Sequence, residues 1–470
     1  MLLLRQDQRM GQTVEQAGRR ANPALAALIA ESGSSHAGLA RRVNELAARQ
    51  GLELRYDKSS VTRWLDGKQP RGEVSFFVAD ALAAKLGRPV SPADCGFAVP
   101  QAPAVSARTL IYPGGVGEAL HALSELGAVD VSRRSVLGAV PFVAAALVAP
   151  QRHWLLDLAE DKEPPPAPLD ADSPAAAVGE MIGVFDSMDN RFGGAHARAS
   201  VIRYLTSEVI PLLRRRDLAP AERTALFTAA AKLAATSGWM SYDTGEYGLA
   251  QRYMTQGLRL CREGRDKVLA GQILAGMSHL ATSLGHTDEG VTLARIGLVT
   301  ARGAGSPLGM MRLHAMAARA YAANGDESAA TTALKAADVA LEASRGPADE
   351  SVWVSYLDAA YLQAESAHCF RDLGHPASAA RSATASVSAN AGRGRRQAIS
   401  QAVLATAYLQ QNQLDAALAT ATAGLGMLGK IHSQRSTQAL REFRKRLTPY
   451  QREPAVARFQ VASELVLGAA

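Results

Sequence analysis

The residues whose types and spacing best suit binding chemistry lie between positions 41 and 71. The stretch Lys58-Ser-Ser-Val-Thr-Arg-Trp-Leu65 puts hydroxyl groups and cations on one side of a helix, and Val61, Trp64 and Leu65 on the other. A helix that enters the major groove of DNA needs short polar side chains near its N-terminus, so that the backbone can approach the base edges. It also needs flanking cations to hold phosphates. This segment therefore predicts a DNA recognition helix.

The residues expected to contact DNA come from this helix, from the turn after it and from the helix before it. They are Arg41, Arg42, Lys58, Ser59, Ser60, Thr62, Arg63, Lys68, Gln69 and Arg71. We expect Arg63 to read a base and Lys68 to hold a phosphate, whereas Trp64 packs the helix on its scaffold. The alternative is an ordinary helix cap with a solvated polar face. Arg41 and Arg42 could equally be solvated.

Charge and cysteine content fit an intracellular nucleic-acid binder. The chain has 470 residues and a formal net charge of +7, and eight Lys or Arg stand against four acids between residues 41 and 71. Its three cysteines are far apart and form no CxxC pair, which argues against a zinc site and a disulfide framework and fits a reducing compartment. No N-terminal signal peptide is evident. We expect a cytoplasmic, nucleoid-associated protein.

No set of residues in the sequence converges on catalysis. Asp186, Asp189, His196 and Arg198 suggest an acid–base or metal site, but they lack a third convergent ligand and a glycine-rich phosphate loop. The scattered histidines have no metal-ligand spacing either. These four residues are better explained as partners that cap and pair helices. We therefore expect a protein that is not an enzyme and that needs no cofactor or metal.

Three regions follow one another along the chain. Helical spacing, Asn22-Pro23 as a helix start and Gly51 as a stop predict a compact helical DNA-binding domain at 20–98. Residues 99–174 have the Pro, Ala and Gly content of a linker around an apolar helical segment, 136–149. Residues 175–470 are predicted to form a helical repeat domain with capping helices at its end. The whole chain is expected to be all-α.

The repeat is marked by small residues at fixed distances from five turn residues. The turns are Gly245, Gly285, Gly325, Gly374 and Asn412; the small residues five and twelve positions later are Ala250, Gly290, Ala330, Ala379, Ala417, Gly257, Gly297, Ala337, Ser386 and Gly424. In a helix-turn-helix array the second helix approaches its neighbours closely, which small side chains permit. The uneven spacing predicts one inserted loop near residues 346–347. Such arrays bind peptides or partners on the inner face.

A ligand or partner groove on that face would be lined by aromatic residues and one cation. They are Trp239, Tyr242, Arg312, Trp353 and Tyr356. The alternative for each aromatic residue is packing within its own repeat.

Motifs spread over nearly the whole chain resemble an actinobacterial regulator family. They are Ala40-Arg-Arg-Val-Asn44, Val61-Thr-Arg-Trp-Leu-Asp-Gly-Lys-Gln-Pro-Arg-Gly72, Val131-Ser-Arg-Arg-Ser-Val-Leu-Gly-Ala139, Arg191-Phe-Gly-Gly-Ala-His-Ala-Arg198, Gly238-Trp-Met-Ser-Tyr-Asp-Thr-Gly245 and Leu249-Ala-Gln-Arg-Tyr253. That family joins a phage (lambda) repressor-like, Xre-type helix-turn-helix to a tetratricopeptide-like α-solenoid. The resemblance implies a streptomycete-type negative regulator of sporulation and antibiotic production. The connection at 50–57 is longer than the tight turn of a standard helix-turn-helix.

Together these features predict a transcription regulator, a repressor, that binds double-stranded DNA as a homodimer. Its repeat domain would sense a small molecule, a peptide or a protein partner. The alternative function is a protein-interaction scaffold that docks another regulator without binding DNA. Residues 132–149 resemble a twin-arginine export signal, but they are internal and too short to span a bilayer. We expect this segment to pack against the repeats, and a membrane contact is the less favoured alternative.

Overall fold

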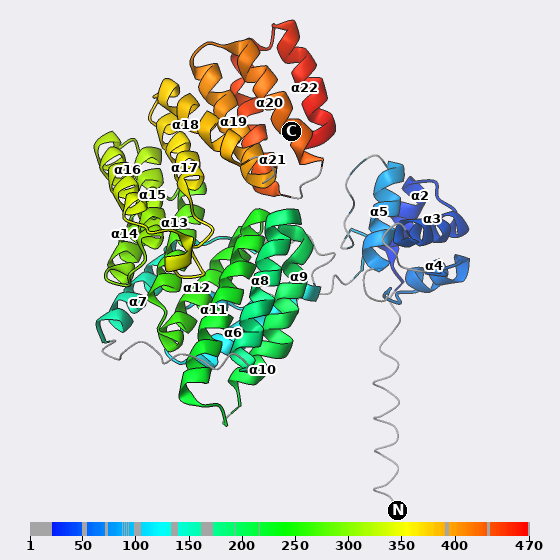
Figure 1. The fold of residues 1–470 in the computed structure, drawn as a ribbon. Coiled ribbons are helices and arrows are strands. Elements are labelled where there is room, and N and C mark those ends of the chain that lie inside the picture. Colours follow the sequence, from blue (N-terminus) through cyan, green and yellow to red (C-terminus); the bar gives the residue numbers. More distant parts are fainter. Residues whose placement is uncertain are drawn as a thin grey trace, which may run out of the picture. The chain divides into compact units, whose positions relative to one another are not determined.

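The computed structural model describes residues 21–48, 54–70, 74–86, 88, 90, 92, 94–97, 105–132, 140–160, 173–192, 194–215, 217–390, 394–429 and 433–468. In these ranges every regular element is a helix, so the all-α prediction is confirmed. The chain divides into two compact units, one of residues 1–104 with 133–137 and one of 105–132 with 138–470 (Figure 1).

In its described residues, the smaller unit is built on four helices. They are α2 (Pro23–Glu31), α3 (His36–Ala48), α4 (Lys58–Leu65) and α5 (Val74–Leu86). Asn22 caps α2 by accepting a hydrogen bond from the Leu25 amide, as the Asn-Pro pair predicts. Gly67 has a φ of +86° after α4, a conformation that glycine adopts without a Cβ penalty. Residues from all four helices share one apolar core, which includes Leu25, Val43 and Val61.

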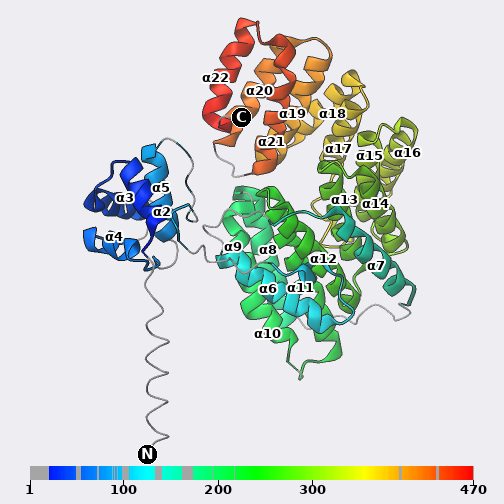
Figure 2. The same ribbon diagram turned by 180° about the vertical axis from the view of Figure 1, so that it is seen from behind.

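The larger unit begins with helices in the region that the sequence assigns to a linker. They are η1 (Ala107–Leu110), α6 (Val116–Ser132), η2 (Ala144–Leu147) and α7 (Val148–Glu160). All four belong to the larger unit, and Figure 2 shows α6 and α7 beside α12 (Tyr247–Gly264). The predicted linker therefore differs from the structure over residues 105–132 and 140–160.

Buried polar side chains of α12 explain why this linker-like sequence is ordered. Gln256 Nε2 donates to the carbonyl oxygens of Thr109 and Ile111, at 2.8 and 2.9 Å. Arg252 donates to the Pro141 carbonyl, at 3.1 Å, and Gln251 to that of Val143, at 2.7 Å. Irregular backbone is thus satisfied by side chains that come more than a hundred residues later, as buried carbonyl groups require.

The described part of the apolar segment packs within the larger unit, in agreement with the favoured prediction. Val140 and Leu147 are buried in its main core, while 136–139 and Arg71 lie outside the described residues. Among the described residues, no helix has the length and apolar character needed to cross a membrane.

The rest of the unit is a succession of antiparallel helices. It opens with α8 (Pro174–Phe192), α9 (Gly194–Tyr204), η3 (Leu205–Val209) and α10 (Ile210–Leu213). Helix pairs follow: α11 (Pro220–Asp243) with α12, α13 (Lys267–Ser283) with α14 (Thr287–Ala301), α15 (Pro307–Ala323) with α16 (Glu327–Glu342), α17 (Ala359–Asp372) with α18 (Pro376–Ala389), and α19 (Gly394–Gln410) with α20 (Leu414–Leu428). The helices α21 (Gln434–Arg446) and α22 (Pro454–Leu467) end the described chain.

All five predicted turn residues lie between the two helices of a pair and have positive φ. The angles are 84°, 85°, 77° and 77° for the glycines in chain order and 61° for Asn412. The small residues pack closely, as predicted: a Cβ atom at Gly297 would lie 2.3 Å from Leu313 Cδ2, and Ala250 and Ala330 are fully buried. The predicted insertion is the connection between α16 and α17, which contains η4 (Pro347–Asp349).

The first helices of the pairs form one layer. In this layer α11, α13, α15, α17, α19 and α21 each contact the next, and α21 also contacts α11. The array therefore returns on itself, and its last helices meet its first (Figure 1). This layer holds the second candidate site described below.

Candidate functional sites

Helix α4 is held in place by an N-terminal cap and by an apolar face. Asp57 accepts hydrogen bonds from the Ser60 amide and the Ser60 hydroxyl, both at 3.0 Å, and from the Ser59 hydroxyl at 2.7 Å. These hydrogen bonds to Ser59 and Ser60 lower the pKa of Asp57 to about 2. On the other side, Val61 and Trp64 are buried in the core, so the prediction that Trp64 packs the helix on its scaffold is confirmed.

The connection before α4 is fixed by one side chain of α3. Asn44 donates from Nδ2 to the Tyr56 carbonyl at 2.9 Å, and its Oδ1 accepts from the Tyr56 amide at 3.0 Å. The Tyr56 ring in turn lies 5.2 Å from that of Trp64, measured between centroids. Residues 54–57 therefore position α4, even though the connection is longer than a tight turn.

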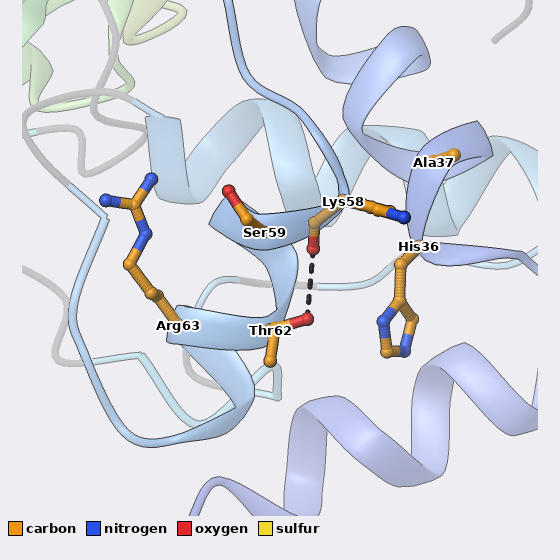
Figure 3. A pocket seen from close by; sticks show the side chains of 6 residues that line it. All are labelled: His36, Ala37, Lys58, Ser59, Thr62 and Arg63. Carbon is orange, nitrogen blue, oxygen red and sulfur yellow. Dashed lines mark hydrogen bonds between the residues drawn. The ribbon is translucent and has the colours of Figure 1, made fainter.

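The exposed side of α4 lines a shallow hollow of about 660 Å³ with the start of α3 (Figure 3). Lys58, Ser59, Thr62 and Arg63 come from α4 and are all exposed. His36, which the sequence analysis does not single out, faces them from α3. The described residues that line it include no acid, so this surface offers cations and hydroxyl groups to a polyanion.

The other predicted DNA contacts are not all on this surface. Ser60 is 4% exposed and serves the helix cap, so its hydroxyl is not available to a base. Arg41 and Arg42 both pair with Glu45, at 3.7 and 3.1 Å, as in the alternative of a solvated helix face. Lys68 and Gln69 are exposed in the turn after α4.

All five residues predicted for a groove line one cavity of about 530 Å³ in the larger unit. Trp239 and Tyr242 come from α11, Arg312 from α15, and Trp353 and Tyr356 from the insertion before α17. Arg312 Nη1 donates to the Tyr356 hydroxyl at 2.9 Å, and the Trp353 indole donates to Asp266 at 2.6 Å. Repeats that are distant in sequence therefore contribute to one site.

Guanidinium groups lie over the aromatic rings of this cavity. Arg312 Cζ is 5.3 Å from the centroid of Trp239, and Arg435 Cζ is 4.9 Å from that of Tyr242. Arg396 Cζ lies 5.5 Å from the Tyr356 centroid. Arg396 and Arg435 are not among the residues predicted from the sequence. In the sequence, these two arginines are marked only by their positions near the starts of α19 and α21, two helices of the layer described above.

Most carboxylates of the cavity are engaged in ion pairs, and Glu442 accepts a hydrogen bond from Gln438 instead. Asp189 and Asp243 share Arg395, at 3.0 and 3.3 Å, and Glu365 pairs with Arg319 at 2.6 Å. Asp186 pairs with Lys232 at 3.0 Å. Asp186 and Asp189 thus pair helices, as predicted. Arg198 does the same by pairing with Asp130.

Two histidines, His279 and His368, line the same cavity, and their surroundings disfavour the protonated form. Burial lowers the pKa of His279 well below its ordinary value, and Arg435 and other nearby arginines lower it further. Burial and Arg319 act in the same direction on the pKa of His368. Among the described residues, no group of three acidic, histidine or cysteine side chains is placed to hold a metal ion.

Comparison with known proteins concerns the smaller unit. A family described as SP15 N-terminal domain matches residues 25–98, which include α3, α4, α5 and all but the first two residues of α2. No curated protein matches the chain. The similarity therefore covers the part of the chain that carries the α4 surface.

Proposed function

We propose that this protein is a DNA-binding transcription regulator, in which the smaller unit is an Xre-like helix-turn-helix and the larger unit a tetratricopeptide-like solenoid that senses a signal. The observation that carries the proposal is the exposed face of α4. Lys58, Thr62 and Arg63 present cations and a hydroxyl group on one side, while Val61 and Trp64 anchor the other side.

The geometry of α4 favours contact through its side rather than through its first amides. Asp57 occupies the N-terminus of the helix as a carboxylate, and a negative group there opposes a DNA phosphate. The exposed side has no such acid. Arg63 is the base reader of the proposal and Lys58 and Lys68 hold phosphates, a division of roles that protein–DNA complexes commonly show.

The biological role proposed from the sequence resemblance is repression of development and antibiotic production, in the cytoplasm and on the nucleoid. The regulator acts as a homodimer, because one small module gives limited affinity and paired half-sites add to it. Sedimentation of the full chain with and without DNA tests this part; a monomer under both conditions contradicts it.

The DNA-binding part is tested by selecting bound sequences from a random duplex pool and then measuring affinity by gel shift at several salt concentrations. Arg63→Ala should cost about 1–3 kcal/mol and relax sequence choice. Lys68→Ala should weaken all sequences alike and reduce the salt slope by about one. Lys85→Gln is the matched control, because Lys85 is an exposed cation of α5 outside the hollow. Equal binding by wild type and an Arg63→Ala/Lys68→Ala double variant favours the scaffold function instead.

A further inference from the structure

We propose that the cavity of the larger unit binds a small organic anion, whose carboxylate or phosphate meets Arg312, Arg396 and Arg435 and whose ring or chain lies against Trp239 and Tyr356. The inference rests on the proposed sensing function and names the chemistry of the ligand that this site takes.

Among the described residues, three guanidinium groups of the cavity have no carboxylate partner. The cavity carboxylates on α8, α11 and α17 are paired with Lys232, Arg395, Arg319 and Arg371, and the one on α21, Glu442, accepts a hydrogen bond from Gln438. Among the described residues, Arg312, Arg396 and Arg435 form no ion pair with a carboxylate, and each lies over aromatic rings instead. A buried charge is costly unless it is paired, and Arg312 is only 5% exposed. An oxyanion supplies the missing partner.

The described residues of the cavity also include hydrogen-bond donors that are unused. Within the described part of the chain, Arg312 Nε, Gln272 Nε2 and Arg319 Nε are buried and have no acceptor. Gln272 and Arg312 are neighbours, because Arg312 Nη1 donates to Gln272 Oε1 at 2.7 Å. Buried donors without acceptors are rare in proteins. All three residues line the cavity, so a ligand with acceptor atoms would satisfy donors that are unused in this structure.

The size and the walls of the cavity also suit a small organic molecule. The volume of about 530 Å³ lies within the range of roughly 300–1,000 Å³ that is usual for small-molecule sites. Trp239 and Tyr356 give this space apolar walls. A guanidinium group that already lies over an aromatic ring is weakly hydrated and offers its N–H groups in one plane, the arrangement that binds carboxylate and phosphate in two-point contacts.

The test measures binding of matched charged and uncharged probes to the full chain by titration calorimetry. The pairs are adenosine 5′-monophosphate with adenosine, for a phosphate, and 1-naphthoate with 1-naphthol, for a carboxylate. We expect at least one anion to bind ten or more times as tightly as its uncharged match. Failure of both anions to bind at concentrations up to ~1 mM, or equal binding of the uncharged probes, overturns the inference.

Variants locate the site. Arg435→Gln and Arg396→Gln change partly exposed side chains, and each should weaken the bound anion at least tenfold while the circular dichroism spectrum is kept. Lys335→Gln is the control, since Lys335 is an exposed cation of α16 outside the cavity. Unchanged affinity in both arginine variants, or equal loss in the control, contradicts the assignment.

A final measurement separates this inference from the proposed function. The gel shift is repeated with saturating probe. Probe binding that leaves DNA affinity unchanged supports the ligand site and contradicts sensing. DNA binding that depends on Arg63, in a protein that binds no anionic probe, supports the regulator and contradicts the ligand site.

Discussion

One shared ion pair connects helices from the two ends of the helical array. Arg395 of α19 lies between Asp189 of α8 and Asp243 of α11, and Ser433, just before α21, donates to Asp243 at 2.8 Å. Asp243 is 1% exposed as a residue. These contacts join the start of the larger unit to its end, so they should set how firmly the cavity is closed.

Replacing Arg395 by Met leaves two carboxylates without a cation. Breaking a buried ion pair costs about 3–5 kcal/mol. The value here should lie near 3 kcal/mol, because Asp243 keeps donors from Ser433 and from the Gly194 amide and because the Asp189 side chain is 19% exposed and can be hydrated. Neutralising both carboxylates in the same variant (Asp189→Asn/Asp243→Asn) should recover most of this loss.

The assay is urea unfolding with hydrogen exchange resolved to individual helices, because helical arrays can open locally before they unfold as a whole. Amide hydrogen exchange should increase more in α19 and α21 than in the other helices. Arg215→Met is the control: its pair with Asp217 is exposed, at 49% and 65%, and such pairs contribute about 0–1 kcal/mol. A loss in Arg395→Met no larger than in this control, or exchange unchanged in α21, would refute the reasoning.

Further predictions concern pH and packing. The pKa values of His279 and His368 are lowered in the folded protein. At a pH below the pKa that these histidines have in the unfolded chain, the unfolded chain therefore binds more protons than the folded protein. Stability should therefore fall as pH falls from about 7 toward 5, by up to about 1.4 kcal/mol per pH unit for each histidine, and His279→Gln should reduce that slope in urea titrations; an unchanged slope contradicts the pKa assignment. Gly297→Ala brings a Cβ within 2.3 Å of Leu313 and should lower the free energy of unfolding by about 1–3 kcal/mol. Gly426→Ala, in open space on α20, should raise it by about 0.5–1 kcal/mol, so equal effects would contradict the packing argument.

Local patterns in the sequence predict the helices and turns well, because the interactions that form these elements are local. Helix α5 is expected from about Val74 to Leu86 and has those bounds. The five turn residues are predicted from spacing alone, and all adopt positive φ. A tight turn between two helices commonly needs a residue in the left-handed conformation. The linker prediction fails over residues 105–132 and 140–160 for the opposite reason. Their order depends on Gln251, Arg252 and Gln256 of a distant helix, which no local composition reveals.

The two candidate sites differ in the same way: the α4 surface depends on local sequence, and the cavity depends on contacts between distant helices. The α4 surface is predictable because one helix supplies four of its six lining residues, and amphipathic spacing tells exposed from buried positions. Ser60 is the exception, because a capping residue at the first turn turns inward to serve the backbone. The cavity draws on α8, α11, α13, α15, α17, α19 and α21. The aromatic residues and Arg312 can be found from composition, whereas Arg396 and Arg435 reach the same space only because the array curves until α21 contacts α11. That curvature sums small rotations between successive repeats, so the residues that complete the site are set by the path of the whole array rather than by any motif around them.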